Sequence, residues 1–203
     1  MWEGSNSPLG IVSDVTALHH SMLTAEAGDS PAREVDVAND DGTRLLVAEI
    51  AARMRLLLER AQLCLDQLDD SQAWYRPNPE SNAVGNLVLH LVGNLRQWIL
   101  GGIGGVPDAR DRPAEFAATT GLTTSALKAL LSAAVEDSCR TIEGMPLARV
   151  TERKVIQGED TTISYALVMA VSHLGLHVGQ MQYVAKMLLG SGYRVSWVPG
   201  AGR

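Results

Sequence analysis

Apolar side chains recur every three or four residues from Thr43 onward, which is the spacing of one face of an α-helix. The first such segment runs to about Leu68, and the two prolines of the following sequence WYRPNPES stop a helix there. Its apolar stripe is Leu46, Ile50, Met54, Leu57, Ala61, Cys64 or Leu65, and Leu68. We therefore expect a long amphipathic helix over residues 43–68.

Three more segments have the same character, over residues 82–100, 124–143 and 164–189. Glycine-rich sequence follows the first of them, and glycines also follow the other two. The expected N-caps are Ser81 or Asn82, then Thr123 or Thr124, and finally Ser164. Four long helices with one longer connection predict an all-α fold, a four-helix bundle.

The remaining sequence predicts little regular structure. Residues 149–163, RVTERKVIQGEDTTI, contain two short extended stretches around a QGED turn, which predicts a small hairpin before the last helix. Residues 1–42 show no sustained period and are rich in Asp, Gly, Pro and Ser in their second half, which predicts a poorly ordered, irregular N-terminal tail. The helical domain is therefore expected over residues 43–203.

Composition narrows the class of protein. The formal net charge is −6 and no block of Lys and Arg occurs, which argues against a nucleic-acid partner. No run of 18 apolar residues is uninterrupted, and the N-terminus lacks a basic region followed by an apolar one, so we expect neither a membrane span nor a signal peptide. Cys64 and Cys139 fall on predicted helices and are expected to be reduced and buried. These features predict a soluble, cytoplasmic protein.

Three of the five histidines lie within apolar helical sequence. His173 and His177 are four residues apart and therefore project from one helix face, where they could share a metal ion. His90 lies on another apolar helix and could complete the site. The alternative is that each is a hydrogen-bonded core residue. The peptidase motif His-Glu-x-x-His is absent, because leucine follows His173, and no carboxylate near the histidines is evident as an acid or base.

Polar residues flank these histidines at helical spacing. Asn86 and Asn94 lie four residues before and after His90, and Gln180 lies three residues after His177. They are candidates for the hydrogen bonds that fix the tautomers of metal-binding histidines. The alternative for each is a helix–helix hydrogen bond unrelated to a metal.

The charged loop DARDRPAEF after the second helix has two interpretations. In the functional one, Arg110 or Arg112 grips an anionic substrate at the mouth of the helices. In the structural one, which we favour, internal salt bridges pin the loop and Phe116 packs into the core. Glycines at 85, 93, 175 and 179 allow another helix to approach closely, within the chain or across a dimer.

Residues 45–189 resemble the DinB/YfiT-like superfamily of metal-dependent enzymes, and most closely its DinB-like uncharacterised branch. The resemblance is carried by SNAVGNLVLHLVGNLRQWIL, DARDRPAEF, SHLGLHVGQMQYV and the WYRPNP linker. It implies a four-helix bundle with a long crossover and a divalent metal, zinc or nickel, held by His90, His173 and His177. Relatives are often dimers, which implies a homodimer.

The resemblance also implies a function. Better-understood relatives are transferases or isomerases that use a low-molecular-weight thiol, so we expect a thiol-dependent S-transferase or isomerase acting on a small electrophile. Two alternatives stay open: a non-catalytic, metal-binding bundle linked to the stress response, and a metal-dependent hydrolase that activates water. The expected partner is a small-molecule substrate.

Overall fold

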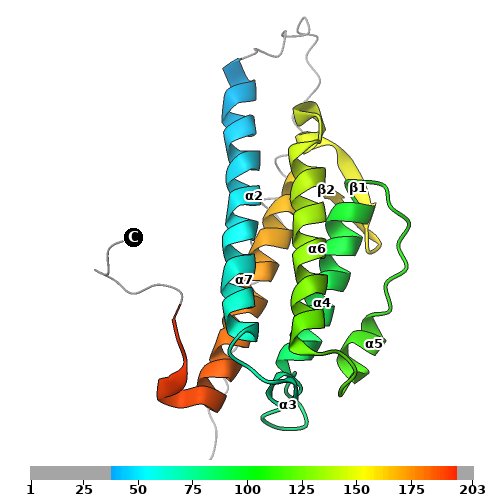
Figure 1. The fold of residues 1–203 in the computed structure, drawn as a ribbon. Coiled ribbons are helices and arrows are strands. Elements are labelled where there is room, and N and C mark those ends of the chain that lie inside the picture. The colour runs from blue at the N-terminus through cyan, green and yellow to red at the C-terminus, as the bar shows by residue number, and fades with distance from the viewer. Residues whose placement is uncertain (1–37, 196–203) are drawn as a thin grey trace, which may run out of the picture. The chain divides into compact units, whose positions relative to one another are not determined.

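A computed structural model describes residues 38–195, and in this part of the chain the protein is mostly helical with a small two-stranded sheet (Figure 1). The long helices are α2 (Ala38–Leu65), α4 (Val84–Leu95), α6 (Thr124–Glu143) and α7 (Ile163–Leu189). The short elements are α3 (Asp70–Ala73), the π-helix η1 (Arg96–Gly101) that continues α4, α5 (Arg112–Ala117), the 3-10 helices η2 (Leu147–Thr151) and η3 (Gly190–Gly192), and strands β1 (Arg153–Ile156) and β2 (Glu159–Thr162).

The predicted tail mostly lies outside the described residues, which begin at residue 38, and so do His19 and His20. Helix α2 already starts at Ala38, before the expected start at Thr43. Within the described helices, none is long and apolar enough to cross a membrane.

The four long helices share one apolar core. Helix α2 packs against α6 and α7, and α4 packs against the same two helices. The buried face of α2 begins at Val47, which is 5% exposed, whereas Leu46 of the predicted stripe is 56% exposed. Cys64 and Cys139 are free and buried in this core, as predicted. Burial raises the pKa of their thiols, to about 12 for Cys64 and about 11 for Cys139, because a thiolate there would lose its hydration.

The caps of α6 and α7 show how local sequence sets the helix ends. Thr123 is the N-cap of α6, as predicted, and its side chain accepts a hydrogen bond from the backbone N–H of Ala126 at 3.2 Å. Helix α7 begins earlier than expected, because Thr162 at the end of β2 caps it in place of Ser164. The hairpin is confirmed: β1 and β2 pair antiparallel around a turn in which Gln157 has a φ of 56°.

Neither Ser81 nor Asn82 caps α4. The N-cap is Ala83, whose backbone N–H donates to Oδ1 of Asn86 at 3.1 Å. The Asn86 side chain therefore folds back over the first turn of α4, where it is fully buried. This arrangement places a polar group one helical turn before His90.

Gly85 was expected to admit a neighbouring helix, but it admits an indole. A Cβ at this position would lie 2.9 Å from three atoms of the Trp74 ring. Trp74 belongs to the linker between α3 and α4, and its Nε1 donates to the carbonyl of Leu122 at 2.8 Å. The Trp-Pro linker is thus fixed against both α4 and the segment that leads into α6.

The connection between η1 and α6, which the sequence suggested to be a loop, contains the short helix α5. Asp111 caps it by accepting from the backbone N–H of Ala114 at 3.1 Å, and a proline occupies its first turn. The helix lies beside α4 (Figure 1), and it brings Glu115 to the histidine of that helix.

Candidate metal centre

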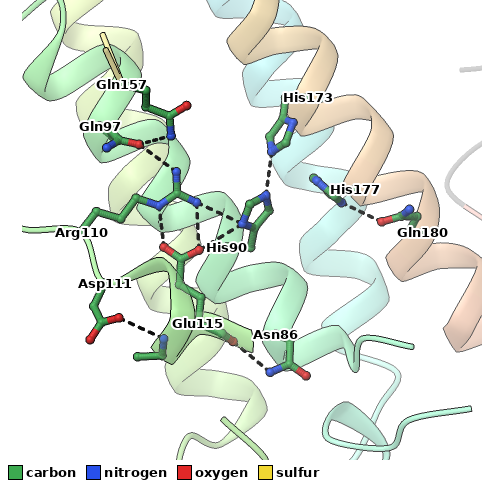
Figure 2. Close-up of polar contacts among 11 residues, drawn as sticks. Asn86, His90, Gln97, Arg110, Asp111, Glu115, Gln157, His173, His177 and Gln180 are labelled. Atoms are coloured by element: carbon green, nitrogen blue, oxygen red, sulfur yellow. Dashed lines mark hydrogen bonds and ion pairs between the residues drawn. The ribbon is translucent and has the colours of Figure 1, made fainter. Parts of the chain in front are cut away.

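The structure brings the three histidines together. His90 comes from α4, and His173 and His177 come from successive turns of α7 (Figure 2). One ring nitrogen from each lies within 4.8 Å of the others, and the Nε2 atoms of His90 and His173 are 2.9 Å apart. His90 is buried, whereas the pair on α7 is half-buried. The pair therefore lies at the edge of the core face rather than within it.

This spacing suits a single ion. Zinc–nitrogen bonds are roughly 2.0–2.1 Å long, so two nitrogens on one ion can be at most about 4.2 Å apart. All pairs here lie within 4.8 Å, so any excess over that limit is less than an ångström. A small rotation of one imidazole closes such a gap. Three imidazole nitrogens are also a donor set that zinc and nickel accept.

A carboxylate fixes the orientation of His90. Nδ1 of His90 lies 3.0 Å from Oε2 of Glu115, and both side chains are buried. A carboxylate only accepts hydrogen bonds, so Nδ1 carries the proton and donates it to Glu115. The lone pair of His90 is then on Nε2, the atom that faces His173. This is the carboxylate–histidine pairing that commonly supports metal ligands.

Arg110 holds Glu115 in turn. Its Nε donates to Oε1 at 2.7 Å and its Nη2 donates to Oε2 at 2.9 Å, a bidentate contact. Nη2 also lies 3.1 Å from Nδ1 of His90, but the proton on that nitrogen leaves the carboxylate as the acceptor. Nη1 donates to Gln97 at 3.0 Å. The hydrogen bonds of Arg110 therefore go to Glu115 and Gln97. Of the two arginines predicted to bind an anionic substrate, only Arg112 remains available to do so.

Gly93 makes room for this pair, one helical turn after His90. A Cβ there would lie 1.9 Å from Oε1 of Glu115 and 2.9 Å from Nε of Arg110. Any side chain at this position would occupy the space of the carboxylate. The glycine that was expected to admit a helix instead admits an ion pair.

Two further side chains tie α5 to α4. Nδ2 of Asn86 donates to the carbonyls of Glu115 and Ala118, at 3.0 and 2.7 Å. Arg76, in the Trp-Pro linker, donates to the carbonyls of Phe116 and Ala118 at 2.6 and 3.2 Å. Asn86 thus reaches His90 only through the backbone of Glu115, and it has no direct bond to an imidazole (Figure 2).

Gln180 and Asn94 are the other two candidates for a hydrogen bond to a histidine, and only Gln180 makes one. Oε1 of Gln180 lies 2.7 Å from Nδ1 of His177, where an amide oxygen accepts the Nδ1 proton and leaves Nε2 free. Asn94 is 4% exposed, and within residues 38–195 its Oδ1 has no hydrogen-bond partner. The hydrogen bonds of the three histidines in the described part of the chain do not involve Asn94, whose Oδ1 is an unsatisfied acceptor.

Burial favours the neutral form of His90 and His173. The pKa of His173 is lowered to about 4, mainly by burial and also by the positive charge of the neighbouring His177, His90 and two arginines. Burial also lowers the pKa of His90, although its hydrogen bond to Glu115 acts in the opposite direction. Neutral imidazole is the form that binds metal, so at neutral pH no proton has to be displaced from either residue.

A cavity of about 570 Å³ opens beside His90 and His173. Phe116 is half-buried rather than in the core, and its ring centroid lies 4.9 Å from that of His90. The guanidinium of Arg112 lies 5.2 Å above the same phenyl ring. The remaining residues that line the cavity are Asn94, Gln97, Trp98, Arg110, Arg112, Gln157 and Met169.

The interpretation of the charged loop as a merely structural element was wrong in one respect, because one of its carboxylates reaches a histidine. Glu115 lies 25 residues after His90, and no periodic pattern joins the two positions. A local signal does exist: Asp111, followed by a proline and then Glu115, is typical of the start of a short helix. That signal predicts α5 but not the residue that it contacts.

Comparison with known proteins defines the fold class. A DinB-like protein from Bacillus cereus superposes with a TM-score of 0.56 and 18% identity, over 70% of this chain and 90% of that one. A conserved protein from Enterococcus faecalis gives a TM-score of 0.58 and 20% identity, over 70% of this chain and 95% of that one. The chain has a DinB-like fold, which confirms the resemblance inferred from its sequence.

The chain belongs to the family described as "Protein of unknown function (DUF1572)", whose model matches residues 41–201. No curated protein matches it. The family description names no activity, so the activity of this chain is inferred from the site.

Proposed function

We propose that this chain is a DinB-type four-helix bundle that holds one divalent ion, zinc or nickel, on His90, His173 and His177, and uses it to activate a small thiol. The observation that carries the proposal is the convergence of three imidazole nitrogens beside a cavity. Zinc sites with three protein ligands and one open position are typical of catalysis rather than of structural support.

The surroundings of the histidines favour a thiol over water. Glu115 accepts from both Arg110 and His90, so it is not free to act as a general base. The nucleophile must then be a group that loses its proton without help from this chain. A free thiol has a pKa near 8.5 against roughly 15.7 for water, so it needs the smaller shift. A divalent ion, when bound, supplies that shift and makes the thiol a thiolate near neutral pH.

The residues of the chain orient the ligands and shape the space. Glu115 and Gln180 accept the Nδ1 protons of His90 and His177 and so direct their Nε2 atoms inward. Gln157, at the hairpin turn, donates to Gln97 across the cavity rim. A small electrophile would lie in the cavity beside the thiol, from which S-transfer or isomerisation follows.

Metal content tests the first part of the proposal. Tag-free full-length protein should contain one zinc or nickel per chain by elemental analysis, and His173→Ala should lose it. His20→Ala, outside the described residues, is the matched control and should keep wild-type content. A wild-type protein without stoichiometric metal, or an unchanged content in His173→Ala, rejects the site.

A thiol panel tests the second part. Turnover of a small electrophile such as an alkyl halide should require an added thiol, stop with a chelator and return with one metal. Ester or amide turnover without thiol would instead identify a metal-dependent hydrolase. Metal without turnover of either kind would leave the metal-binding bundle without a catalytic role.

A further inference from the structure

The cavity beside the histidines carries an unbalanced positive charge. Among the residues that line it are two arginines and no aspartate or glutamate. The charge of Arg110 is offset by Glu115, with which it forms its bidentate contact. Arg112 has no ion pair within residues 38–195 of the structure. The net charge at the cavity wall is therefore that of one guanidinium.

Arg112 is also held in place. Its guanidinium lies 5.2 Å from the centroid of the Phe116 ring, within the range of a cation–π contact. Phe116 in turn packs against His90, with ring centroids 4.9 Å apart. The guanidinium, the phenyl ring and the metal-site imidazole thus form a stack. The stack leaves the hydrogen-bond donors of the guanidinium free at the rim, a short distance from the histidines.

The metal site would add to this charge. Three imidazoles are neutral ligands, so an ion that they bind keeps its charge of 2+. The only carboxylate that contacts a site histidine in the described part of the chain is Glu115, which Arg110 neutralises. A ligand that enters the cavity is therefore attracted if it is an anion and repelled if it is a cation.

The inner wall offers a second polar contact. Asn94 is one of the residues that line this cavity, and its Oδ1 is buried and has no hydrogen-bond partner in residues 38–195. Leaving a buried acceptor unpaired costs free energy, and such groups in native proteins are usually satisfied by a ligand or by water. Together with Arg112, this acceptor indicates a cavity built for a polar molecule rather than an apolar one.

We propose that the cavity selects an anionic small molecule, a thiol or electrophile that carries a carboxylate, and that Arg112 determines this specificity by binding the carboxylate. The inference rests on the proposed function, since it names the substrate class of the same site. A planar guanidinium matches a carboxylate with two parallel hydrogen bonds. Because such charge-assisted bonds are roughly twice as strong as neutral ones, a preference of about tenfold over a neutral analogue is expected.

The test compares 3-mercaptopropionate with its neutral amide, two probes of nearly the same shape. Calorimetry on zinc-loaded, full-length protein measures the dissociation constant of each. Wild type should prefer the acid by about tenfold, Arg112→Gln should lose most of that preference, and Arg112→Lys should keep a larger part of it than Arg112→Gln does. Arg53→Gln is the matched control, because Arg53 is an exposed arginine on the outer face of α2, and it should behave as wild type.

Each other outcome overturns the proposal. Equal binding of the two probes by wild type, or binding of neither, shows that the cavity does not select an anion. A preference that is undiminished in Arg112→Gln assigns the carboxylate to another group. Metal content is measured on the same samples, so a protein without metal rejects the proposed function separately. The probe ratio is still measured on that protein, since Arg112 and Asn94 belong to the chain.

Discussion

Gly93 offers a precise test of the contact between the carboxylate and His90. In Gly93→Ala the new methyl group would lie 1.9 Å from Oε1 of Glu115, whereas real contacts of this kind are not shorter than 3.0 Å. The carboxylate must therefore move by at least 3.0 − 1.9 = 1.1 Å. Its bonds to Arg110 and His90 are 2.7–3.0 Å long, so a shift of that size breaks at least one of them.

The expected magnitude follows from two opposing effects. Replacing a helical glycine by alanine stabilises a helix by about 1 kcal/mol. Separating a buried ion pair costs about 3–5 kcal/mol, because a charge is left without its partner. The free energy of unfolding of Gly93→Ala should therefore fall by about 2–4 kcal/mol. Metal affinity should also fall, by about 10–100-fold, because His90 loses the acceptor that fixes its tautomer.

Gly179→Ala is the matched control. Gly179 is also an interior glycine of a long helix, α7, but a Cβ there meets no atom within 4 Å. This variant should gain up to about 1 kcal/mol and bind metal as wild type does. Urea unfolding of the metal-free proteins gives the stabilities, and competition with a chromophoric chelator gives the affinities. If Gly93→Ala is as stable as Gly179→Ala and binds metal as tightly as wild type, the role given to Glu115 is wrong.

Two further substitutions and two tests of the buried cysteines probe other parts of the structure. Gln180→Leu removes the acceptor at Nδ1 of His177 and should weaken metal binding about tenfold in the same chelator assay. Thr123→Ala removes the N-cap of α6 and should lower the free energy of urea unfolding by about 1 kcal/mol while metal content stays unchanged. Cys64 and Cys139, whose pKa values burial raises to about 12 and 11, should resist a thiol reagent at pH 8 until the chain unfolds. Because an unfolded thiol ionises near pH 9 while the folded ones stay protonated, stability measured by urea unfolding should fall as pH rises from about 9 toward 11. Rapid labelling of the native protein, or a stability that is flat over that range, would contradict their burial.

The helices and the histidines could be predicted because both follow a helical period. His173 and His177 share a face by spacing alone, and His90 lies in a segment that is apolar on nearly every side. Capping was predicted where the side chain bonds to its own helix, as at Thr123, but not at α4. In α4 the side chain of Asn86, the third residue of the helix, accepts a hydrogen bond from the backbone N–H of the N-cap residue. A search for a polar capping residue before the helix does not find this contact.

The carboxylate could not be predicted, because its partner is distant in sequence. The contact of Glu115 with His90 depends on where the connection after α4 folds back, which no periodicity encodes. Trp74 and Arg76 hold this connection in place through their hydrogen bonds to its backbone carbonyls. Both residues belong to the linker after α3, whose prolines predicted only the end of a helix. The sequence predicts only that Gly93 leaves space for a neighbour, whereas the structure shows that the carboxylate of Glu115 occupies this space.

The metal site on His90, His173 and His177 is best tested by anomalous diffraction from crystals of zinc-loaded, full-length protein, collected on both sides of the zinc edge. We predict one strong anomalous peak per chain. The zinc ion that produces it should be bonded to a ring nitrogen of each of His90, His173 and His177 at roughly 2.0–2.1 Å. A peak elsewhere, or three imidazoles that hydrogen-bond only to one another with no peak between them, would show that these histidines do not hold the ion.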